Sequence, residues 1–457
     1  MITKYKSNKI YYQSTIMLAG PVVVSQLGHT FVQTVDSIII GHYAGTISLA
    51  AVSLVHSVFM VVLVLGMGIA YGLTPLIAQE DGKSNYQECA KLLSNSLWIN
   101  TIAGILLFLV VYYGSMFAMN HVDQDPLVVE TAKPYLLLLG ISILPLMIFQ
   151  TFKQFAEGLG FTKQAMTITI WGNVLNLILA VILVKGIFGI PPMGVRGIGI
   201  ATLIDRVLMM VVMIWYVMKS SNFKQYIQYF SVRFINFQRI INVIKIGVPV
   251  AMQYIFEIGA FAVAALMAGK IGAMEQAAHQ TAITFVAMTY MMASGIASAA
   301  TIKVGNSFGN LNYIRIQKFS RVSYHLVILF MLFFAIIFML FNQYLPYVIT
   351  SDPAVVPLAA QLLIIAGVFQ LFDGTQVVGL GTLRGMGDVK TPTFITFIAY
   401  WIVGLPVAYL LGIKLDIGVK GIWYGLTLGL VTSSVLLYFR SQYIIKNKMK
   451  SLLKNEA

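Results

Sequence analysis

Charged residues are scarce in this chain, and their scarcity excludes a water-soluble fold. Only 10% of the 457 residues are charged, whereas 58% are hydrophobic and the mean hydropathy is +0.84. A soluble globular domain carries about 25% charged residues. A chain of this composition is therefore predicted to be an integral membrane protein.

Cysteine and reactive motifs are also missing. Cys89 is the single cysteine, which excludes an intramolecular disulfide framework and a cysteine metal site. The chain has no HExxH motif, no GxSxG motif in a catalytic context and only scattered histidines, so we do not expect an enzyme. Its net charge of +14 forms no basic cluster interleaved with aromatics in a soluble domain, so we expect no nucleic-acid partner.

Long apolar runs fill the sequence from end to end. Transmembrane β-strands would be shorter and would alternate in polarity, so these runs predict α-helices. Windows of about 20 residues give twelve transmembrane helices, and the expected fold class is an all-α integral membrane protein. The expected spans are 15–40, 48–77, 93–118, 132–156, 165–186, 196–218, 243–268, 278–302, 322–347, 355–380, 392–413 and 420–442.

Lysine and arginine are distributed unequally between the expected loops. Cytoplasmic loops of membrane proteins hold an excess of these residues. If both termini are cytoplasmic, the inner segments carry most of them, and the outer loops keep only Lys133, Lys185, Arg196, Lys270, Lys414 and Lys420. The pattern predicts an even number of spans, with both ends in the cytoplasm.

The sequence repeats itself once, at an offset of 227 residues. Gly68–Ala70 recurs as Gly295–Ala297, and Gly158–Gly160 corresponds to Gly385–Gly387. The register shifts by a few residues toward the ends of each half. Because six spans is an even number, the two halves have the same orientation in the membrane and form parallel repeats.

Two domains and a linker follow from this repeat. We expect an N-terminal six-helix bundle over 1–218, a cytoplasmic linker over 219–242 and a C-terminal six-helix bundle over 243–457. The linker alternates aromatics and isoleucine with basic residues, which favours a helix lying on the inner membrane surface in contact with lipids. Two parallel bundles around a central cleft are typical of a transporter that works by alternating access, and they predict a monomer.

Few polar side chains fall within the first-half spans. Gln26, His29, Gln33 and Asp36 are spaced by 3, 4 and 3 residues, so they share one face of a helix. That face points either into the cleft or into a hydrogen-bond network between helices. The adjacent Asp205–Arg206 pair in the sixth span is interpreted as an ion pair, within its helix or between helices, rather than as a substrate contact.

The second half carries two isolated carboxylates. Glu257 lies near the middle of the apolar stretch Ile246–Ala268, and Asp373 lies in the tenth span. A carboxylate buried without a base either takes up a proton or binds a cation, so both are candidates for a coupling-ion site. At an offset of 228 residues Glu257 corresponds to His29, so the repeats share a fold but not their acids.

Several short motifs resemble one known family. They are VDSIIIGHYAG (Val35–Gly45), GVPVAMQYIFE (Gly247–Glu257), AAHQ (Ala277–Gln280), EGLGFTK and RGMGDVKTP. Together they resemble the multidrug and toxic compound extrusion (MATE) family, and within it the bacterial NorM-like branch. The resemblance implies a cation-coupled antiporter that exports amphipathic, often cationic, organic compounds across the inner membrane. It implies Na⁺, with H⁺ as the alternative, as the coupling ion and no other cofactor.

The resemblance also implies a cation site in the C-terminal half. Glu257 and Asp373 would bind Na⁺, and Tyr290 would lie beside them as a cation–π neighbour. Phe369, one turn before Asp373, stands where some members have a tyrosine, so it offers a ring but no hydroxyl.

A second site is implied in the N-terminal half. It would consist of Asp36, Asn176 and Thr202 and would bind a cation or the drug. The chain departs from the family pattern at Ala180, where several members have Asn or Asp. Asn173 is the residue that would compensate.

Two further functions are compatible with the span count. A lipid-linked oligosaccharide or peptidoglycan-precursor flippase of the same superfamily would favour a cationic cavity for pyrophosphate, whereas the candidate cleft residues here are acidic or neutral. A channel would lack saturable, gradient-coupled countertransport, which is the observation that distinguishes it.

Overall fold

The computed structural model is helical throughout, and no strand occurs in the residues that it describes, which are 2–115, 125–187 and 189–455. Side chains are not described for 2–7, 29, 30, 33, 58, 61, 115 and 449–455. Eleven helical segments in the described part are long and apolar enough to cross a membrane, and this count does not include α1 (Ile2–Tyr43), the helix of the first expected span.

The first half of the chain is organised around one central helix, α6 (Pro126–Gly158), which packs against α2, α4 and α8. Residues 116–118 of the expected third span lie outside the described residues. The remaining elements are α2 (Gly45–Tyr71), α3 (Leu73–Gly82), α4 (Tyr86–Leu109) with the π-helical extension η1 (Val110–Ser115), α7 (Thr162–Lys185), α8 (Val195–Lys219), the 3₁₀ turn η2 (Ser221–Phe223) and α9 (Lys224–Ile227).

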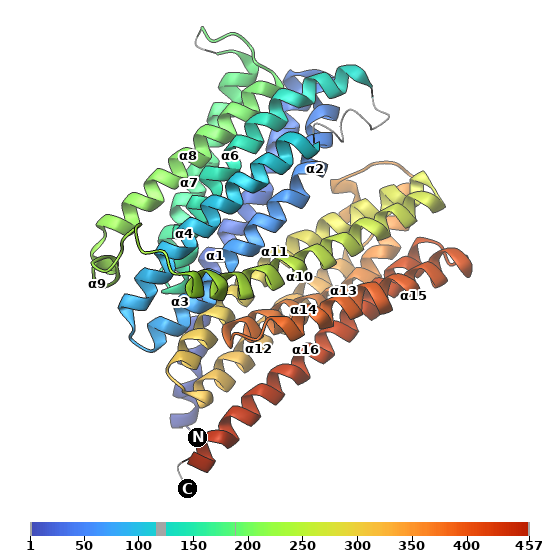
Figure 1. The fold of residues 1–457 in the computed structure, drawn as a ribbon. Coiled ribbons are helices and arrows are strands. Elements are labelled where there is room, and N and C mark those ends of the chain that lie inside the picture. Colours follow the sequence, from blue (N-terminus) through green and yellow to red (C-terminus); the bar gives the residue numbers. More distant parts are fainter. Residues whose placement is uncertain (1, 116–124, 188, 456–457) are drawn as a thin grey trace. The chain divides into compact units, whose positions relative to one another are not determined.

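The second half repeats this arrangement around α13 (Val355–Gly385), which packs against α11, α12 and α16. Helix α14 continues through two π-helical segments and α15 without a break, so these four elements together make one span (Figure 1). The elements are α10 (Phe237–Ile271), α11 (Ala273–Gly309), α12 (Tyr313–Leu340), η3 (Leu345–Val348), α14 (Lys390–Phe397), η4 (Ile398–Gly404), α15 (Leu405–Tyr409), η5 (Leu410–Lys414) and α16 (Val419–Asn455).

The repeat extends to the details of the helix ends. Asn85 caps α4 by accepting a hydrogen bond from the third backbone N–H, and Asn312 caps α12 in the same way. The residues just before these caps, Ser84 and Leu311, adopt left-handed φ angles of 58° and 56°. A leucine rarely adopts this conformation, so its presence at the equivalent position shows that the turn geometry, not the side chain, has been retained. The internal repeat is thereby confirmed.

The chain forms two compact units whose boundaries lie inside helices. The N unit is Val24–Ala251, and the C unit is Met1–Val23 together with Met252–Ala457. Each boundary comes shortly after a proline, Pro21 in α1 and Pro249 in α10, which removes one backbone hydrogen bond from its helix. The start of α1 therefore belongs with the second half of the chain, and the start of α10 belongs with the first.

Specific contacts hold each exchanged segment in its unit. In the C unit, the Tyr12 hydroxyl and His325 Nδ1 of α12 are 2.9 Å apart. In the N unit, Gly72 lies against Gly247 of α10 so closely that a Cβ on Gly72 would be 2.7 Å from the Gly247 backbone. Small residues allow helix backbones to approach in this way in membrane proteins.

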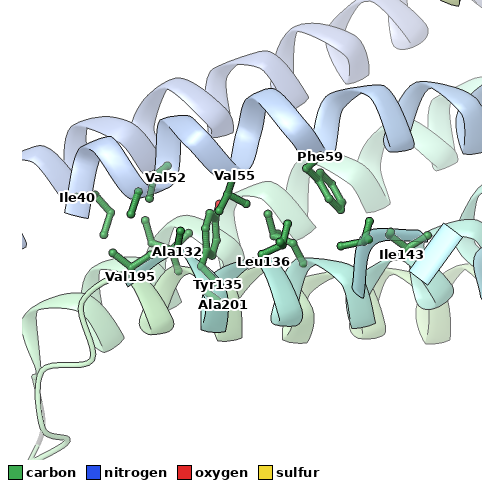
Figure 2. Close-up of a cluster of buried hydrophobic side chains, with 14 of the residues drawn as sticks. Ile40, Val52, Val55, Phe59, Ala132, Tyr135, Leu136, Ile143, Val195 and Ala201 are labelled. Atoms are coloured by element: carbon green, nitrogen blue, oxygen red, sulfur yellow. The ribbon is translucent and has the colours of Figure 1, made fainter. Parts of the chain in front are cut away.

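Each unit has its own apolar core. Figure 2 shows part of the N-unit core, in which α1, α2, α6 and α8 contribute interlocking side chains including Ile40, Val52, Phe59, Leu136 and Ala201. In the C unit, the α10 and α11 contribution is a row of fully buried alanines, Ala260, Ala264, Ala268, Ala278 and Ala282, packed in a cluster with large aromatics of α13, η4 and α16.

Candidate functional site

Two carboxylates from different helices are buried in the C unit. Glu257 projects from α10 with 4% of its surface exposed, and Asp373 projects from α13 with 1% exposed. They are close enough that their charges repel one another when both are ionised. The two residues that the family resemblance assigns to one site are thus both buried in the same unit, within electrostatic range of each other.

Two tyrosines supply hydroxyl groups to this pair. The Tyr290 hydroxyl of α11 donates to Glu257 Oε2 across 3.4 Å, and the Tyr400 hydroxyl of η4 also hydrogen-bonds to Glu257. Gln376 of α13 fixes Tyr400 by donating from Nε2 to the phenol oxygen at 2.9 Å. Tyr400 and Gln376 are site residues that the sequence interpretation missed, because no spacing distinguishes Tyr400 among 23 tyrosines.

Several carboxylate oxygens of this pair have no hydrogen-bond partner, which indicates what the pair can bind. Within the described residues, Glu257 Oε1 and both carboxylate oxygens of Asp373 are buried without a hydrogen-bond partner. Buried polar atoms are normally satisfied, and an exception needs an explanation such as an absent ion. Oxygen ligands of this kind suit a hard cation or a proton.

Aromatic side chains pack around Phe369, a residue near Asp373 on α13. Its ring is fully buried, one turn before Asp373, with centroids 5.4 Å from Trp423 and 6.0 Å from Phe261. Phe261 in turn lies one turn after Glu257 on α10. Apolar rings therefore lie one turn from each carboxylate along its own helix, and the burial of the pair strengthens the electrostatic interaction between its charges.

The N unit contains a second group of buried polar residues, centred on Asp36. This residue is 5% exposed, and its Oδ1 atom has no hydrogen-bond partner in the described part. Asp205 and Arg206 of α8 act on it electrostatically. The side chains of His29 and Gln33, which share the Asp36 face in the sequence pattern, lie outside the described residues.

The other residues expected in the N-unit site form a separate contact. Asn176 Nδ2 of α7 donates to Thr202 Oγ1 of α8 at 3.4 Å, and the buried atoms Asn176 Oδ1 and Asn173 Nδ2 lack partners in the described part of the chain. Ala180, one turn after Asn176, is fully buried in the apolar core of the N unit. The position therefore contributes packing instead of a ligand.

Arg206 differs from the expectation of an ion pair with Asp205. Its NH1 group donates to Ser142 Oγ at 2.7 Å, and its guanidinium lies 5.5 Å from the centroid of the Phe59 ring. Among the described residues, no carboxylate lies within 4.0 Å of it. Neighbouring residues on a helix point about 100° apart, so adjacency in sequence does not bring two charges together.

A buried ion pair near the C-terminal end of α6 was also missed. Lys153 and Glu157 are 5% and 4% exposed, with 3.9 Å between Lys153 Nζ and Glu157 Oε1. Lys153 Nζ also donates to Ser25 Oγ of α1 at 3.2 Å. Their spacing of four residues was a usable signal, but their place at the end of the expected fourth span gave them the appearance of loop residues.

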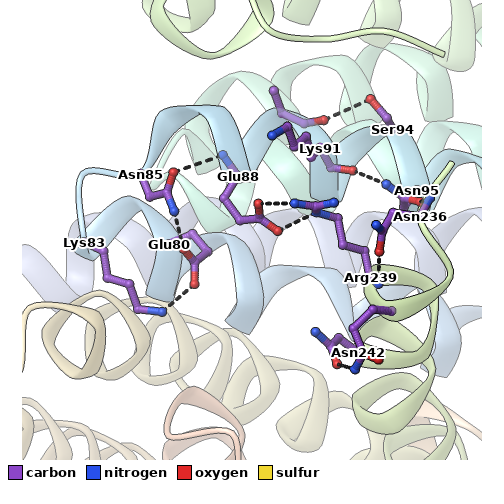
Figure 3. Close-up of polar contacts among 12 residues, drawn as sticks. Glu80, Lys83, Asn85, Glu88, Lys91, Ser94, Asn95, Asn236, Arg239 and Asn242 are labelled. Carbon is purple, nitrogen blue, oxygen red and sulfur yellow. Dashed lines mark hydrogen bonds and ion pairs between the residues drawn. The ribbon is translucent and has the colours of Figure 1, made fainter. Parts of the chain in front are cut away.

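Contacts near the linker are shown in Figure 3. Arg239 donates two hydrogen bonds to the Glu88 carboxylate of α4, at 2.6 and 2.7 Å, and Asn95 accepts from the Asn236 backbone at 2.7 Å. Earlier in the linker, the Tyr226 hydroxyl donates to Asp81. Burial and this hydrogen bond raise the pKa of Tyr226 above its usual value, so the donor stays protonated. Within the expected linker, 219–242, helix is limited to the end of α8, η2, α9 and the start of α10 at Phe237, and the stretch between α9 and α10 is not helical.

The sequence matches a known protein family and several named relatives. The profile of the MatE family matches the chain twice, over residues 21–182 and 249–410, one match for each half. Multidrug resistance protein MdtK of Yersinia pseudotuberculosis serotype O:1b is 30% identical over 449 residues, covering 97% of this chain and 98% of the relative. The probable multidrug resistance protein NorM of Agrobacterium fabrum is 28% identical over 446 residues, covering 96% of each.

Solved structures share the fold. The crystal structure of the eukaryotic MATE transporter AtDTX14 matches with a TM-score of 0.87 and 18% identity, covering 97% of this chain and 99% of that one. A MATE crystal structure in the bent conformation matches with a TM-score of 0.88 and 19% identity, covering 98% and 99%. The expected all-α, multi-span membrane fold is confirmed.

Proposed function

This chain belongs to the MatE family of membrane transporters, and we propose that it is a cation-coupled antiporter that exports amphipathic, often cationic, organic compounds. Its relatives match nearly the full length of the chain and are named as multidrug resistance proteins. These names support small organic molecules as substrates. Alternating access between the two sides of the membrane is the transport mechanism that parallel repeats favour.

The main support for ion coupling is that carboxylate oxygens of Glu257 and Asp373 have no hydrogen-bond partners in the described structure. Three buried carboxylate oxygens without partners are costly in a low-dielectric interior. Binding of one cation between the two carboxylates would neutralise much of this charge and occupy those oxygens. Na⁺ is the favoured ion because the available ligands are all oxygens, from two carboxylates and the Tyr290 and Tyr400 hydroxyls; H⁺ is the alternative.

Energy for export then comes from the ion gradient. Each unit charge that moves inward through a membrane potential gains about 2.3 kcal/mol per 100 mV. Cation entry from outside offsets part of the negative charge of Glu257 and Asp373 and weakens the attraction of the site for a cationic drug, so the drug is released outward. Return of the cation to the cytoplasm restores the negative charge that attracts the next drug molecule.

The N-unit residues Asp36, Asn176 and Thr202 are proposed as a second polar site for a cation or the drug. Support comes from the buried Asp36 Oδ1 and Asn176 Oδ1 atoms, which lack partners in the described structure. Arg206 supplies positive charge near Asp36. Asp205 adds negative charge near the same residue. We assign the main coupling role to Glu257 and Asp373, because three of their carboxylate oxygens are buried without partners in the described structure, against one of Asp36.

We further propose a monomer in the bacterial inner membrane with both termini in the cytoplasm. The excess of Lys and Arg in the segments assigned to the inside supports this orientation. The linker would lie at the lipid surface on that side, because Phe234, Ile235 and Phe237 are more than half exposed beside the exposed Arg233.

Purified protein in liposomes tests the proposal. Efflux of a fluorescent cationic drug is measured with an imposed Na⁺ gradient at equal pH on both sides, and separately with a pH gradient at equal Na⁺. Saturable efflux driven by the Na⁺ gradient is expected. Efflux that responds to neither gradient, or drug movement that does not saturate, contradicts ion-coupled antiport.

A further inference from the structure

Arg384 is a basic residue whose guanidinium turns into the C unit at the C-terminal end of α13. Its NH2 group donates to Gln253 Oε1 of α10 at 3.3 Å. Its Nε atom is buried and has no hydrogen-bond partner in the described part of the structure. A guanidinium has five N–H groups and no acceptor, so the Arg384 guanidinium keeps an unused donor at Nε.

The internal repeat shows that Arg384 lacks a partner on its own helix. The equivalent residue in the first half, 227 positions earlier, is Glu157, and Lys153 one turn before it lies 3.9 Å away. The residue one turn before Arg384 is the apolar Leu380. Among the described residues, no carboxylate lies within 4.0 Å of Arg384. A counter-charge for Arg384 must therefore come from another helix.

Gln253 directs Arg384 toward Glu257. Its amide Nε2 donates to the Val389 carbonyl at 3.2 Å and to Thr393 Oγ1 at 3.0 Å, which fixes the orientation of the amide and leaves Oε1 facing the guanidinium. Gln253 lies one turn before Glu257 on the same helix. Arg384 already acts on Glu257 electrostatically across this gap.

We propose that Arg384 is the internal counter-charge of the coupling-ion site and competes with the cation for Glu257. In this structure the guanidinium donates to Gln253, an arrangement that leaves Glu257 Oε1 available to the cation. When the cation leaves, the guanidinium moves to the free Glu257 Oε1 and forms a charge-assisted hydrogen bond there. The proposal rests on the cation-coupled function given above.

Such a residue would solve a specific problem of an antiporter. A carrier that has released both ion and drug must not leave two buried carboxylates uncompensated. A long, flexible arginine side chain that contacts Gln253, one helical turn before Glu257, can compensate one of them without leaving the protein. Arg384 would then set the concentration at which the cation displaces it, because binding of one excludes binding of the other.

A simpler role for Arg384 predicts a different behaviour. A cation in the last turn stabilises a helix through the helix dipole, and an arginine after a span helps to set topology. Either role makes Arg384 important for folding but gives no reason for the apparent affinity for the coupling ion to change. The affinity for the ion therefore separates the two roles.

Ion titrations of drug efflux from liposomes test the proposal with three variants. The concentration of the driving ion that gives half-maximal efflux is measured for wild type, Arg384→Gln, Arg384→Lys and Gln253→Leu. Arg384→Gln removes the competing charge, so the ion concentration that gives half-maximal efflux should fall about tenfold. A change of this size is expected when one nearby charge is removed from a medium of intermediate dielectric constant. Arg384→Lys keeps the charge and should stay within about threefold of wild type.

Gln253→Leu gives the opposite expectation. This change removes the Gln253 amide that accepts from Arg384 and frees the guanidinium to pair with Glu257. The ion concentration that gives half-maximal efflux should therefore rise. Opposite shifts in Arg384→Gln and Gln253→Leu are not expected from a folding role, since general destabilisation would lower the maximal rate of both. If Arg384→Gln does not reach the membrane, the rise in Gln253→Leu and the small effect of Arg384→Lys carry the test.

Two failures are distinguishable in this experiment. A wild type driven by neither Na⁺ nor H⁺ contradicts the proposed function itself. A wild type that is ion-driven, with half-saturation unchanged in Arg384→Gln and Gln253→Leu, overturns the role of Arg384 and leaves the antiport proposal in place.

Discussion

The Tyr290 hydroxyl and Glu257 Oε2 are 3.4 Å apart and join α11 to α10 inside the C unit. This is long for an O–H···O hydrogen bond, whose usual length is about 2.7–2.8 Å, and the contact is correspondingly weak. A weak tether orients the carboxylate without holding it when a cation binds. The ring of Tyr290 lies at the same site, so the hydroxyl and the ring can be tested separately.

Replacement of Tyr290 by phenylalanine should therefore have a small effect. We expect Tyr290→Phe to retain at least about one third of wild-type efflux, because a net hydrogen bond contributes about 1 kcal/mol and this one is weak. Tyr290→Ala should reduce efflux by tenfold or more, a loss of about 1.4 kcal/mol or more, because ring packing and any cation–π contact are lost as well. Equal losses in both variants would show that the hydroxyl, and not the ring, carries the role.

The Lys153–Glu157 pair predicts an asymmetric effect on stability. Lys153→Met leaves Glu157 buried without its counter-charge and should lower the free energy of unfolding by about 3 kcal/mol. The double variant Lys153→Met with Glu157→Leu should recover much of this loss, since no unpaired charge remains. Thermal unfolding in detergent measures both, and a double variant less stable than Lys153→Met contradicts the interpretation.

The Arg239–Glu88 contact predicts a smaller effect that depends on salt. Both side chains are 24% exposed, so solvent screens the pair, and Arg239→Gln should cost no more than about 1 kcal/mol. The loss should shrink at high ionic strength. Exchange of the two residues, Glu88→Arg with Arg239→Glu, is the control and should restore part of the stability. Loss of drug efflux in Arg239→Gln, with stability unchanged, would point to a role beyond fixing the linker.

The spans and the repeat were predictable because both can be recognised in the sequence without knowing which helices contact one another. A run of apolar residues predicts a membrane helix whatever its neighbours are, and Asn85 and Asn312 recur at one offset whatever lies between them. The pairing of Glu257 with Asp373 was a different kind of prediction. It followed from the resemblance to a family, since 116 residues separate them in the sequence.

Contacts between helices were beyond the sequence. Hydropathy gives the face of a helix but not which neighbour that face meets, so Tyr400 and Gln376 were not expected at the Glu257 carboxylate. The same reason explains Arg206, which reaches Ser142 on α6 instead of its neighbour Asp205. In the linker, the contact of Asn95 on α4 with the Asn236 backbone holds a non-helical stretch where the alternating pattern predicted helix.

The central claim is that Glu257 and Asp373 bind the coupling ion, and ion-driven drug efflux from liposomes tests it most directly. Wild type, Glu257→Gln, Asp373→Asn and Asp36→Asn are compared at fixed pH under an imposed Na⁺ gradient, with Glu130→Gln, an exposed glutamate on α6, as the matched control. Ion-driven efflux should be lost in Glu257→Gln and Asp373→Asn and unchanged in Glu130→Gln, with all proteins present in the membrane. Asp36→Asn should keep a measurable part of its ion dependence. Wild-type efflux in Glu257→Gln would contradict the claim.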